Sequence, residues 1–332
     1  MKVFFRELWS RAGSPPWPLR VLLLALSRIF AGLVAARGLL YDSGLLPAQR
    51  VDCRVISIGN ISVGGSGKTP LVLWMVRKVK AADLSVVVVS RGYGGNAGSV
   101  RVVGGEGGRL EDADGAADEA VLVALRAACP VVTGKDRVAA ARLAVARFSP
   151  DLVIMDDGFQ HRRLARDLDL VIAPDPDHER ELLPAGPLRE PLAALGRADL
   201  VVEVRRSALG LVTSVESELP DLELSRLGGA RVLAVAGIAG PEAFVGMLRE
   251  AGAEIVETLL FADHHCYGPD DLEKIRNASL QADLVVTTEK DLVKLADLDV
   301  TPAQLLALRI AIKVSEEEEI ISRILEFDPN RA

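Results

Sequence analysis

Hydrophobic residues form short, nearly unbroken runs along the chain, and these runs alternate with longer stretches of mixed polarity. Residues 54–59, 85–90 and 151–155 are such runs, rich in Val, Ile and Leu. Short continuous apolar runs are typical of parallel strands that are buried on both faces, and the stretches between them suit covering helices. The pattern predicts an α/β protein built on a parallel sheet flanked by helices.

The pattern weakens between residues 207 and 228, where mixed polar sequence shows no strong period. An alternating pattern then starts again, with predicted strands at 231–237, 254–261 and 283–288 and predicted helices at 241–251 and 270–276. We therefore expect a larger lobe over residues 46–210, a connection at 211–227 and a smaller α/β lobe with a parallel sheet at 228–332.

The first 45 residues form a third region, predicted to be a membrane-associating helix. Residues 18–41 are rich in Leu and Val but contain Arg20, Arg28 and Arg37. A transmembrane span would place Arg28 near the bilayer centre, which is costly, whereas a helix lying in the interface lets the arginines reach anionic head groups. A long helix packed on the core of the protein itself is the equally open alternative.

Composition and charge narrow the classes of function. A chain of 332 residues is long enough for two domains, and its 49% hydrophobic but only 4% aromatic residues suit helices packed on sheets. The net charge of -7 argues against a nucleic-acid partner, because binding to the phosphate backbone needs many Lys and Arg contacts. Residues 1–50 run against this trend, with seven basic and two acidic side chains, which favours an anionic membrane surface as a partner.

The three cysteines, Cys53, Cys129 and Cys266, show neither metal-binding spacing nor an even set for disulfides. A reducing compartment is the simpler interpretation. The apolar run that begins at Val21 is not followed by a cleavage site of the signal-peptide kind, so we expect the folded body in the cytoplasm.

A glycine-rich loop follows the first predicted strand and precedes a helical pattern, which is the context of a phosphate-binding P-loop. Backbone N–H groups around the glycines are expected to hold phosphate oxygens, the lysine to reach the β- and γ-phosphates, and the threonine to bind Mg²⁺. The nucleotide-binding residues would be Gly64, Gly65, Ser66, Gly67, Lys68 and Thr69. The strict motif would place glycine where Ser62 stands, so an ordinary glycine turn is the competing interpretation.

Two other predicted strands end in polar residues. The third ends in Asp156 and Asp157, and a carboxylate that closes a strand beside a P-loop is the Walker B arrangement for holding Mg²⁺. Adjacent residues of an extended strand face opposite ways, so one of the two is expected to play another part. The second strand runs into Arg91 and Tyr93, which are candidates for substrate contacts.

Taken together, these motifs resemble the tetraacyldisaccharide 4′-kinase family, the lipid A 4′-kinases of Gram-negative bacteria. The resemblance covers most of the chain and is carried by SIGNISVGGSGKTP at 57–70, SRGYG at 90–94, DE at 118–119, GKDR at 134–137, DDGFQH at 156–161, LPAGPLRE at 183–190, DHH at 263–265 and TEKD at 288–291.

The resemblance implies transfer of the γ-phosphoryl group of ATP, with Mg²⁺, to the 4′-hydroxyl of a tetraacylated diglucosamine 1-phosphate, giving lipid IVA. Such an acceptor stays in the bilayer, so the implied location is the cytoplasmic face of the bacterial inner membrane, with peripheral or monotopic attachment. The acidic pair at 118–119 is commonly followed by proline in the family, and Ala120 stands here.

The resemblance also assigns roles to residues. Asp118 and His264 would form the proton-accepting pair, because a carboxylate that accepts the imidazole N–H raises the basicity of the far nitrogen. The implied catalytic set is Asp118, His264, Lys68 and Arg137, and the implied Mg²⁺ set is Thr69, Asp156 and Glu190. Lys290 would reach the ATP side. The implied substrate contacts are Asn60, Arg91, Tyr93, Glu119, Asp157, Gln160, His161 and Arg189.

Arg137 and Arg189 would clamp a phosphate, either of the nucleotide or of the acceptor, because the planar guanidinium matches phosphate oxygens. Arg189 followed by Glu190 can equally be read as a simple ion pair. For the whole protein, the rival hypothesis is a membrane-associated regulatory P-loop ATPase, which would share the P-loop and the basic helix but has no use for Asp118 with His264.

Overall fold

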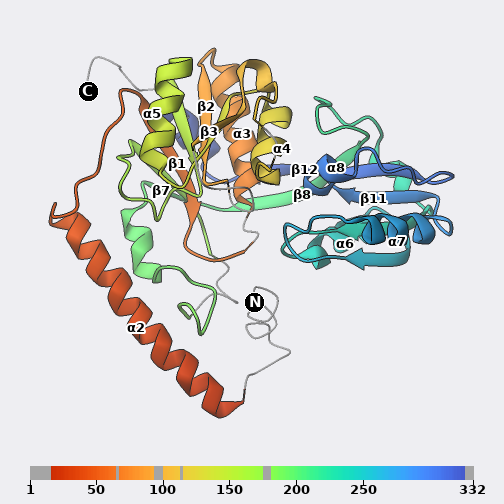
Figure 1. Cartoon of the computed structure of the whole chain (residues 1–332), viewed down its shortest axis with the longest axis horizontal. Helices are drawn as coiled ribbons and strands as arrows, with labels where there is room; N and C mark the ends of the chain where they lie inside the picture. The colour runs from red at the N-terminus through yellow and green to blue at the C-terminus, as the bar shows by residue number, and fades with distance from the viewer. Residues whose placement is uncertain (1–15, 65–66, 93–99, 113–114, 175–180, 326–332) are drawn as a thin grey trace.

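The computed structural model describes residues 16–64, 67–92, 100–112, 115–174 and 181–325. Two lobes lie side by side, each built on its own sheet, and one long helix projects from the first lobe (Figure 1). The predicted α/β class, with a P-loop type of sheet and a second, smaller sheet, is confirmed.

The first lobe contains a seven-stranded sheet in the order β3-β4-β2-β5-β1-β6-β7, parallel except for β3. The strands are β1 (Arg54–Asn60), β2 (Val86–Ser90), β3 (Arg101–Gly104), β4 (Val131–Thr133), β5 (Leu152–Asp156), β6 (Leu168–Ile172) and β7 (Leu200–Val202). The three apolar runs predicted as strands are the central strands of this sheet. Their side chains are buried on both faces, which is why the runs are unbroken.

Helices cover both faces of this sheet. One face packs against α3 (Lys68–Ala81), α4 (Asp118–Ala127) and α9 (Glu317–Leu325), and the other against α5 (Arg137–Phe148). The Asp136 carboxylate caps α5 by accepting the N–H groups of Val138 and Ala139. Of these helices, α3 and α5 begin at the carboxyl ends of the parallel strands β1 and β4, so their N-termini face the same edge of the sheet.

The second lobe contains a five-stranded sheet in the order β10-β9-β11-β12-β8. Its elements are β8 (Val204–Val212), β9 (Arg231–Ala236), α6 (Pro241–Glu250), β10 (Glu254–Leu260), α7 (Pro269–Ser279), β11 (Leu284–Thr288), α8 (Glu289–Leu295) and β12 (Gln304–Val314). The three strands predicted in this region are present and parallel to one another. The sheet also contains β12, parallel to β11, and β8, which runs antiparallel to β12.

The border between the lobes differs from the one expected from the sequence. Residues 204–210 were assigned to the first lobe and 211–227 to a connection, whereas Val204–Val212 is a strand of the second sheet. Most of its side chains are partly or fully exposed, so it lacks the apolar run that marks a buried strand. Its partner, β12, lies about a hundred residues later in the chain, and pairing at such a distance leaves no local signal.

The end of the chain returns to the first lobe. Ile320 and Ile324 of α9 are buried in the core of the first sheet, and the Arg54 guanidinium donates to the Ile324 carbonyl at 2.6 Å. Two long strands, β8 and β12, therefore carry the chain out to the second lobe and back (Figure 1).

The lobes also touch through α4 and α8. Leu122 of α4 packs with Leu292 of α8 in a small apolar cluster. Beside it, one carboxylate oxygen of Glu289 accepts from Arg126 at 3.2 Å and from Arg309 at 2.9 Å. The Arg309 side chain is fully buried, so this three-residue ion network fixes the second lobe against α4.

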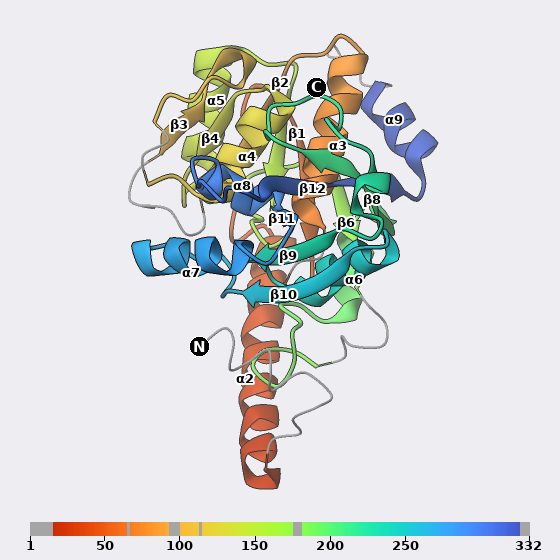
Figure 2. The same cartoon turned by 90° about the vertical axis from the view of Figure 1, so that its right-hand side faces the viewer.

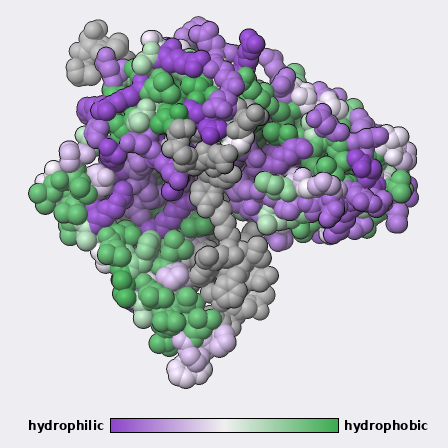
Figure 3. Space-filling model, viewed as in Figure 1, coloured by the Kyte–Doolittle hydropathy of each residue, from purple (hydrophilic) through white to green (hydrophobic). Residues whose placement is uncertain are grey.

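The N-terminal helix α2 (Trp17–Asp42) lies largely outside the body of the first lobe (Figures 1 and 2). Only Leu23 and Ser27 are buried along it, whereas Trp17 is 78% exposed and Leu33 is 65% exposed. Apolar side chains dominate the surface of the projecting part (Figure 3). Of the two alternatives left open by the sequence, packing on the core of the protein is therefore wrong. Within the described residues, α2 is one helix that is long and apolar enough to cross a membrane.

The C-terminal part of α2 is fixed to the first lobe by arginines. The Arg162 guanidinium donates to the Gly38 carbonyl at 3.2 Å and to the Asp42 carboxylate at 2.6 Å. Arg37 donates to the Gln160 carbonyl at 2.9 Å, and both arginines stack on the ring of Tyr41. The helix thus leaves the body at a fixed place beside residues 160–162.

Glu289→Ala tests the buried ion network between the lobes. Removing the carboxylate leaves Arg126 and Arg309 buried without their shared anion, so we expect the free energy of unfolding to fall by about 3 to 5 kcal/mol in urea titrations followed by circular dichroism. The matched control is Glu319→Ala, which breaks the exposed pair with Arg323 and should cost about 1 kcal/mol or less. Equal losses in the two variants would contradict this account.

Candidate active site

The glycine-rich loop lies between β1 and α3, as the motif predicts. Gly67 caps α3 with a φ of +88°, and Gly64 has a φ of +133°. Both conformations are ones that residues with a Cβ rarely adopt, so glycine is required for the loop to turn its backbone toward the start of α3. Gly65 and Ser66 lie outside the described residues. The helix N-terminus, with Thr69 in its first turn, is the side of the loop that suits an anion.

Lys68 is held by side chains at the ends of β1 and β5. Its ammonium donates to Asn60 Oδ1 at 3.2 Å and lies 3.5 Å from Asp157 Oδ1. Asn60 is buried and donates to Ser62 Oγ at 3.3 Å. Ser62, the departure from the strict motif, thus helps to orient the side chain that holds Lys68. Asn60, expected to contact substrate, contacts the P-loop lysine here.

The segment predicted to lie near the active site, LPAGPLRE, runs beside the P-loop. The Arg189 N–H donates to the Ile61 carbonyl at 2.6 Å, and the Val63 N–H donates to the Pro187 carbonyl at 2.8 Å. This backbone pairing brings Arg189 and Glu190 next to the loop.

Asp156 and Asp157 face different surroundings, as expected for neighbours at a strand end. Asp156 is the last residue of β5, pairs in register with Ile58 and is buried. Burial raises the pKa of Asp156 to about 7, and the nearby Glu119 and Asp157 carboxylates add to the rise. Asp157 turns away with a φ of +52°. Burial opposes its ionisation, but Lys68 and Arg189 more than compensate and lower the pKa of Asp157.

The turn after these aspartates leaves no room for a side chain. A Cβ on Gly158 would lie 2.6 Å from Met155 Cε and 2.7 Å from Ser57 Oγ. Only glycine lets the chain pass this close to β1 and β5, and the position of Asp157 depends on that passage.

Asp156 has the chemistry of a magnesium ligand. Within the part of the chain that the structure describes, its Oδ1 is buried and has no hydrogen-bond partner. A buried carboxylate oxygen without a donor is costly, and a hard divalent cation would satisfy it. Thr69, in the first turn of α3, supplies a hydroxyl beside the P-loop. The described residues contain no cluster of three or more His, Cys, Asp or Glu placed for a metal.

The third residue expected at the metal, Glu190, has another partner in the structure. Its Oε2 accepts from Arg197 at 2.8 Å, and the Arg197 guanidinium also lies over the ring of Phe159. The ion pair read from the sequence neighbours Arg189 and Glu190 is therefore wrong. Glu190 as a magnesium ligand stays a prediction.

Arg189 instead forms an ion pair with Asp157. Its Nη1 lies 3.0 Å and 2.9 Å from the two carboxylate oxygens of Asp157 and 3.4 Å from Gln160 Oε1. The Gln160 amide in turn donates to the Asn60 carbonyl at 2.8 Å. Asp157, Gln160 and Arg189, three of the predicted substrate contacts, thus form one network beside Lys68.

Arg137 lies beneath this network. It is buried, and its guanidinium donates to the backbone carbonyls of Gly134 at 2.9 Å and Asp156 at 3.3 Å. Burial lowers the pKa of Arg137 to about 10, while Asp156 and Asp157 favour its charged form. The contacts made here support the end of β5, and a direct contact with phosphate stays a prediction.

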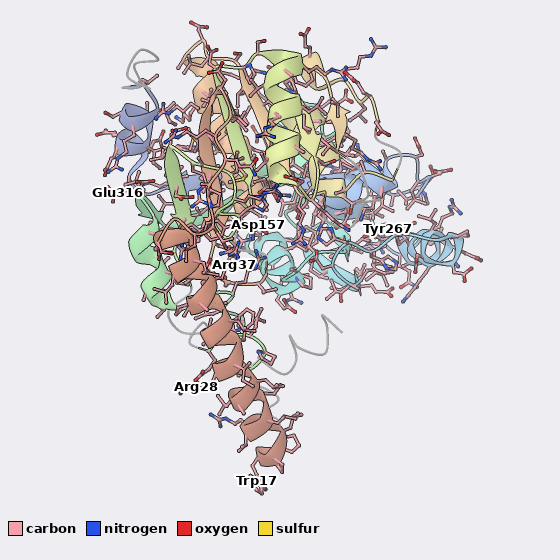
Figure 4. All side chains as sticks on the ribbon, turned by 60° about the vertical axis from the view of Figure 1, so that its left-hand side comes forward. Trp17, Arg28, Arg37, Asp157, Tyr267 and Glu316 are labelled. Atoms are coloured by element: carbon pink, nitrogen blue, oxygen red, sulfur yellow. The ribbon has the colours of Figure 1, made fainter. Side chains whose placement is uncertain are left out.

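A cavity of about 260 Å³ opens between α2 and this network. Four arginines line it, together with apolar side chains of α2, and Arg37 and Asp157 both lie at the base of that helix (Figure 4). The lining includes Arg37, Arg162, Arg189, Arg197, Phe30 and Val34. A lining with several cations and an apolar side fits a phosphorylated amphiphile.

At the contact between the lobes, the structure brings Asp118 and His264 together. His264 Nδ1 lies 3.8 Å from Asp118 Oδ2, although the two residues come from different lobes. His264 has a φ of +62°, a strained conformation for histidine that needs support from its surroundings. Its backbone N–H donates to the Gly237 carbonyl at 3.2 Å. The side chains of Asp118 and His264 therefore lie close together, as expected.

Two lysines of α8 lie beside the Asp118–His264 pair. Lys290 lies 2.9 Å from Asp263 Oδ1 and 3.8 Å from Glu119 Oε1. Lys294 lies 2.5 Å from Asp118 Oδ2. Lys290 was expected to reach toward the nucleotide, and here it bridges the lobes.

Two further residues, Arg91 and Tyr93, were expected to contact the substrate. Arg91 is exposed at the end of β2. Tyr93 lies outside the described residues.

Comparison with known proteins identifies the family. A family model described as Tetraacyldisaccharide-1-P 4'-kinase matches residues 19–327. The chain belongs to the tetraacyldisaccharide 4′-kinase family. It is 40% identical over 357 aligned positions to the tetraacyldisaccharide 4'-kinase of Anaeromyxobacter sp., covering 98% of this chain and 96% of that protein. With the enzyme of Halothermothrix orenii it shares 38% identity, over 84% of each protein.

A solved structure shares the fold of this kinase. It is the "apo" form LpxK from Aquifex aeolicus, described as in complex with ATP, with a TM-score of 0.77 and 32% sequence identity. The likeness covers 92% of this chain and 98% of that one. The family resemblance drawn from the motifs is therefore confirmed.

Sequence reasoning missed several residues that lie beside the candidate site. Lys294 carried a usable signal, because it stands four residues after Lys290 and thus on the same face of α8. Arg162 directly follows His161, the last residue of a recognised motif. Arg197 had no local signal, since its partner Glu190 reaches it only after a turn through a short 3₁₀-helix (Leu192–Arg197).

His161 gives this kinase a pH-dependent stability. Burial, followed by the nearby charge of Arg137, lowers the pKa of His161 from 6.5 to about 4. Between these values the unfolded chain binds a proton that the folded state does not, so this contribution to stability falls as the pH drops through that window. Urea titrations at several pH values should show that His161→Gln loses less stability than wild type between pH 6.5 and 4. Parallel curves for the two proteins would contradict the assignment.

Proposed function

We propose that this protein transfers the γ-phosphoryl group of ATP, with Mg²⁺, to the 4′-hydroxyl of a tetraacylated diglucosamine 1-phosphate, giving lipid IVA. The observation that carries the proposal is the position of the arginine-lined cavity. It opens between the P-loop network and the apolar helix α2, and Arg189 belongs to both the cavity and that network. A site for a phosphorylated lipid thus adjoins a site for a nucleotide.

The nucleotide is expected at the P-loop. Gly64 to Thr69 would surround the β- and γ-phosphates, with Lys68 leaving Asn60 and Asp157 to bind them. Thr69 and Asp156 would hold Mg²⁺, with Glu190 as the predicted third member. The metal would neutralise charge that develops on the phosphate oxygens. The ATP complex of the Aquifex aeolicus relative supports this choice of nucleotide.

The acceptor is expected in the cavity beside α2. Its 1-phosphate would bind among Arg37, Arg162 and Arg197, because guanidinium groups bind phosphate through paired N–H donors. The acyl chains would lie along the apolar side chains of α2, such as Phe30 and Val34. This placement leaves the sugar between the cavity and the P-loop, close to Arg189, Gln160 and Asp157.

Asp118 and His264 are proposed to remove the proton of the attacking hydroxyl. Asp118 accepts the imidazole N–H, which fixes the tautomer and makes the other ring nitrogen the base. Burial opposes the ionisation of Asp118, but the neighbouring His264 and Lys294 more than compensate and lower its pKa, so the carboxylate is ionised for this role. A separation of 3.8 Å requires only a small closure of the lobes to become a hydrogen bond.

The helix α2 is proposed to rest in the membrane interface at the cytoplasmic face of the inner membrane. Its exposed apolar side chains match the acyl region, and Arg20 and Arg28 can reach anionic head groups. The three cysteines are free thiols, in keeping with a reducing compartment.

Assay with radiolabelled ATP, Mg²⁺ and tetraacyl disaccharide 1-phosphate in mixed micelles tests the proposal. We expect phosphate transfer that depends on the lipid, and Asp118→Ala and His264→Ala should each lower kcat roughly 10²- to 10⁴-fold, as expected for loss of a general base. ATP hydrolysis that is indifferent to the lipid would favour a regulatory ATPase instead. Wild-type turnover in both variants would remove the pair from the mechanism.

Membrane binding through α2 has its own test. Leu22→Asp, Leu26→Asp and Ile29→Asp should lower partitioning onto vesicles of zwitterionic and anionic phospholipids by about tenfold for each substitution, because each removes an apolar side chain from the acyl region. The matched control is Leu219→Asp with Leu280→Asp, two exposed leucines of the second lobe. Equal partitioning of both sets would show that α2 does not enter the interface.

A further inference from the structure

Lys294 occupies the junction between the two halves of the Asp118–His264 pair. Its ammonium lies 2.5 Å from Asp118 Oδ2 in the first lobe and donates to the His265 carbonyl at 2.7 Å in the second. The same ammonium lies 6.0 Å from the centroid of the Tyr267 ring. One cation therefore contacts the start of α4 and the loop that presents His264.

We propose that Lys294 is a positioning residue for phosphoryl transfer, which holds the Asp118 carboxylate of the first lobe and the His264 loop of the second lobe in register. This inference rests on the proposed function, because it assigns a role within that reaction. Lys294 does not touch the reacting groups in this account, and acts through Asp118 and the backbone beside His264.

The geometry of the carboxylate supports this role. His264 and Lys294 approach the same oxygen, Asp118 Oδ2, at 3.8 Å and 2.5 Å. The lysine contact is the closer of the two, so it sets where the oxygen lies before the lobes close. A bound cation also keeps the carboxylate ionised, and an ionised carboxylate is the stronger acceptor for an imidazole N–H.

The loop that presents His264 needs an external support, because His264 itself has a positive φ. His265 provides part of this support. Its Nε2 lies in hydrogen-bond contact with Asp271 Oδ2 at 2.8 Å, and its ring stacks on Phe261 with the ring centroids 4.7 Å apart. These contacts hold the loop to its own lobe. The Lys294 bond to the His265 carbonyl is the one that connects the adjoining backbone to the partner of His264 on the other lobe.

The neighbouring lysine does not share this geometry. Lys290 contacts Asp263 and Glu119, not the Asp118 oxygen that His264 approaches. The charged and titratable groups that act on Asp118 or respond to it are His264, Lys294, Lys290 and Tyr267. Of these, Lys294 alone combines a close contact to Asp118 with a bond to the His264 loop, within the described residues.

Lys294→Met in the full-length protein tests the inference by lipid kinase assay. Methionine removes the charge and keeps a long side chain, so we expect kcat to fall roughly 10²-fold, as misplacement of catalytic groups does, with little change in the KM for ATP. The acid limb of the pH profile of kcat/KM should move to higher pH, because Asp118 loses its closest cation. Lys294→Arg, which keeps the charge, should restore most of kcat.

Controls separate this inference from its alternatives. Lys274→Met, on the exposed face of α7, should behave as wild type. A wild-type enzyme that does not phosphorylate the lipid would overturn the proposed function. An active wild type with unchanged kcat and pH profile in Lys294→Met would overturn the role of Lys294 alone, and so would a change confined to the KM for ATP. If Lys294→Met does not fold, as judged by thermal melting, Lys294→Gln takes its place with the same expectations.

Discussion

The parallel pairing of β1 with β5 is the constraint on which the rest of the site depends. It sets Ile58 opposite Asp156, so the strand that feeds the P-loop and the strand that carries the acidic residues end together. Lys68 then reaches Asn60 at the end of one strand and Asp157 just beyond the other. The tight passage at Gly158 and the buried Arg137 maintain this edge from below. A shift of one residue in the register would turn each side chain at the strand end to the opposite face of the sheet and separate these groups.

The second lobe adds a histidine and two lysines to the candidate site. His264, Lys290 and Lys294 all come from it, and they meet the acidic start of α4 where the two lobes touch. Arg126 of α4, Glu289 of α8 and Arg309 of β12 form an ion network at one end of the α4–α8 contact, and the proposed catalytic residues lie at the other end. Strain at His264 is tolerated because both lobes contribute to its support.

The parts of this molecule that the sequence predicts are those with a local physical signature. The strands at 54–59 and 151–155 are buried on both faces, so their apolar runs mark them, and the P-loop follows from glycines at fixed spacing. The strands β8 and β12 carry partly exposed side chains and pair over a long sequence distance, and β8 was missed for that reason. Side-chain partners were equally hidden, as Glu190 shows by bonding Arg197 and not its neighbour. The Asp118–His264 pair came from family resemblance, since no periodicity connects residues of two lobes.

The attachment of α2 carries a consequence for the lipid. Arg37 fastens the helix to residue 160 and also lines the cavity, so the helix axis and the cavity mouth move as one body. If α2 rests in the leaflet as proposed, its tilt would determine how far a sugar head group must be lifted above its acyl chains to enter. Local thickness and curvature of the bilayer would then affect turnover in the proposed reaction.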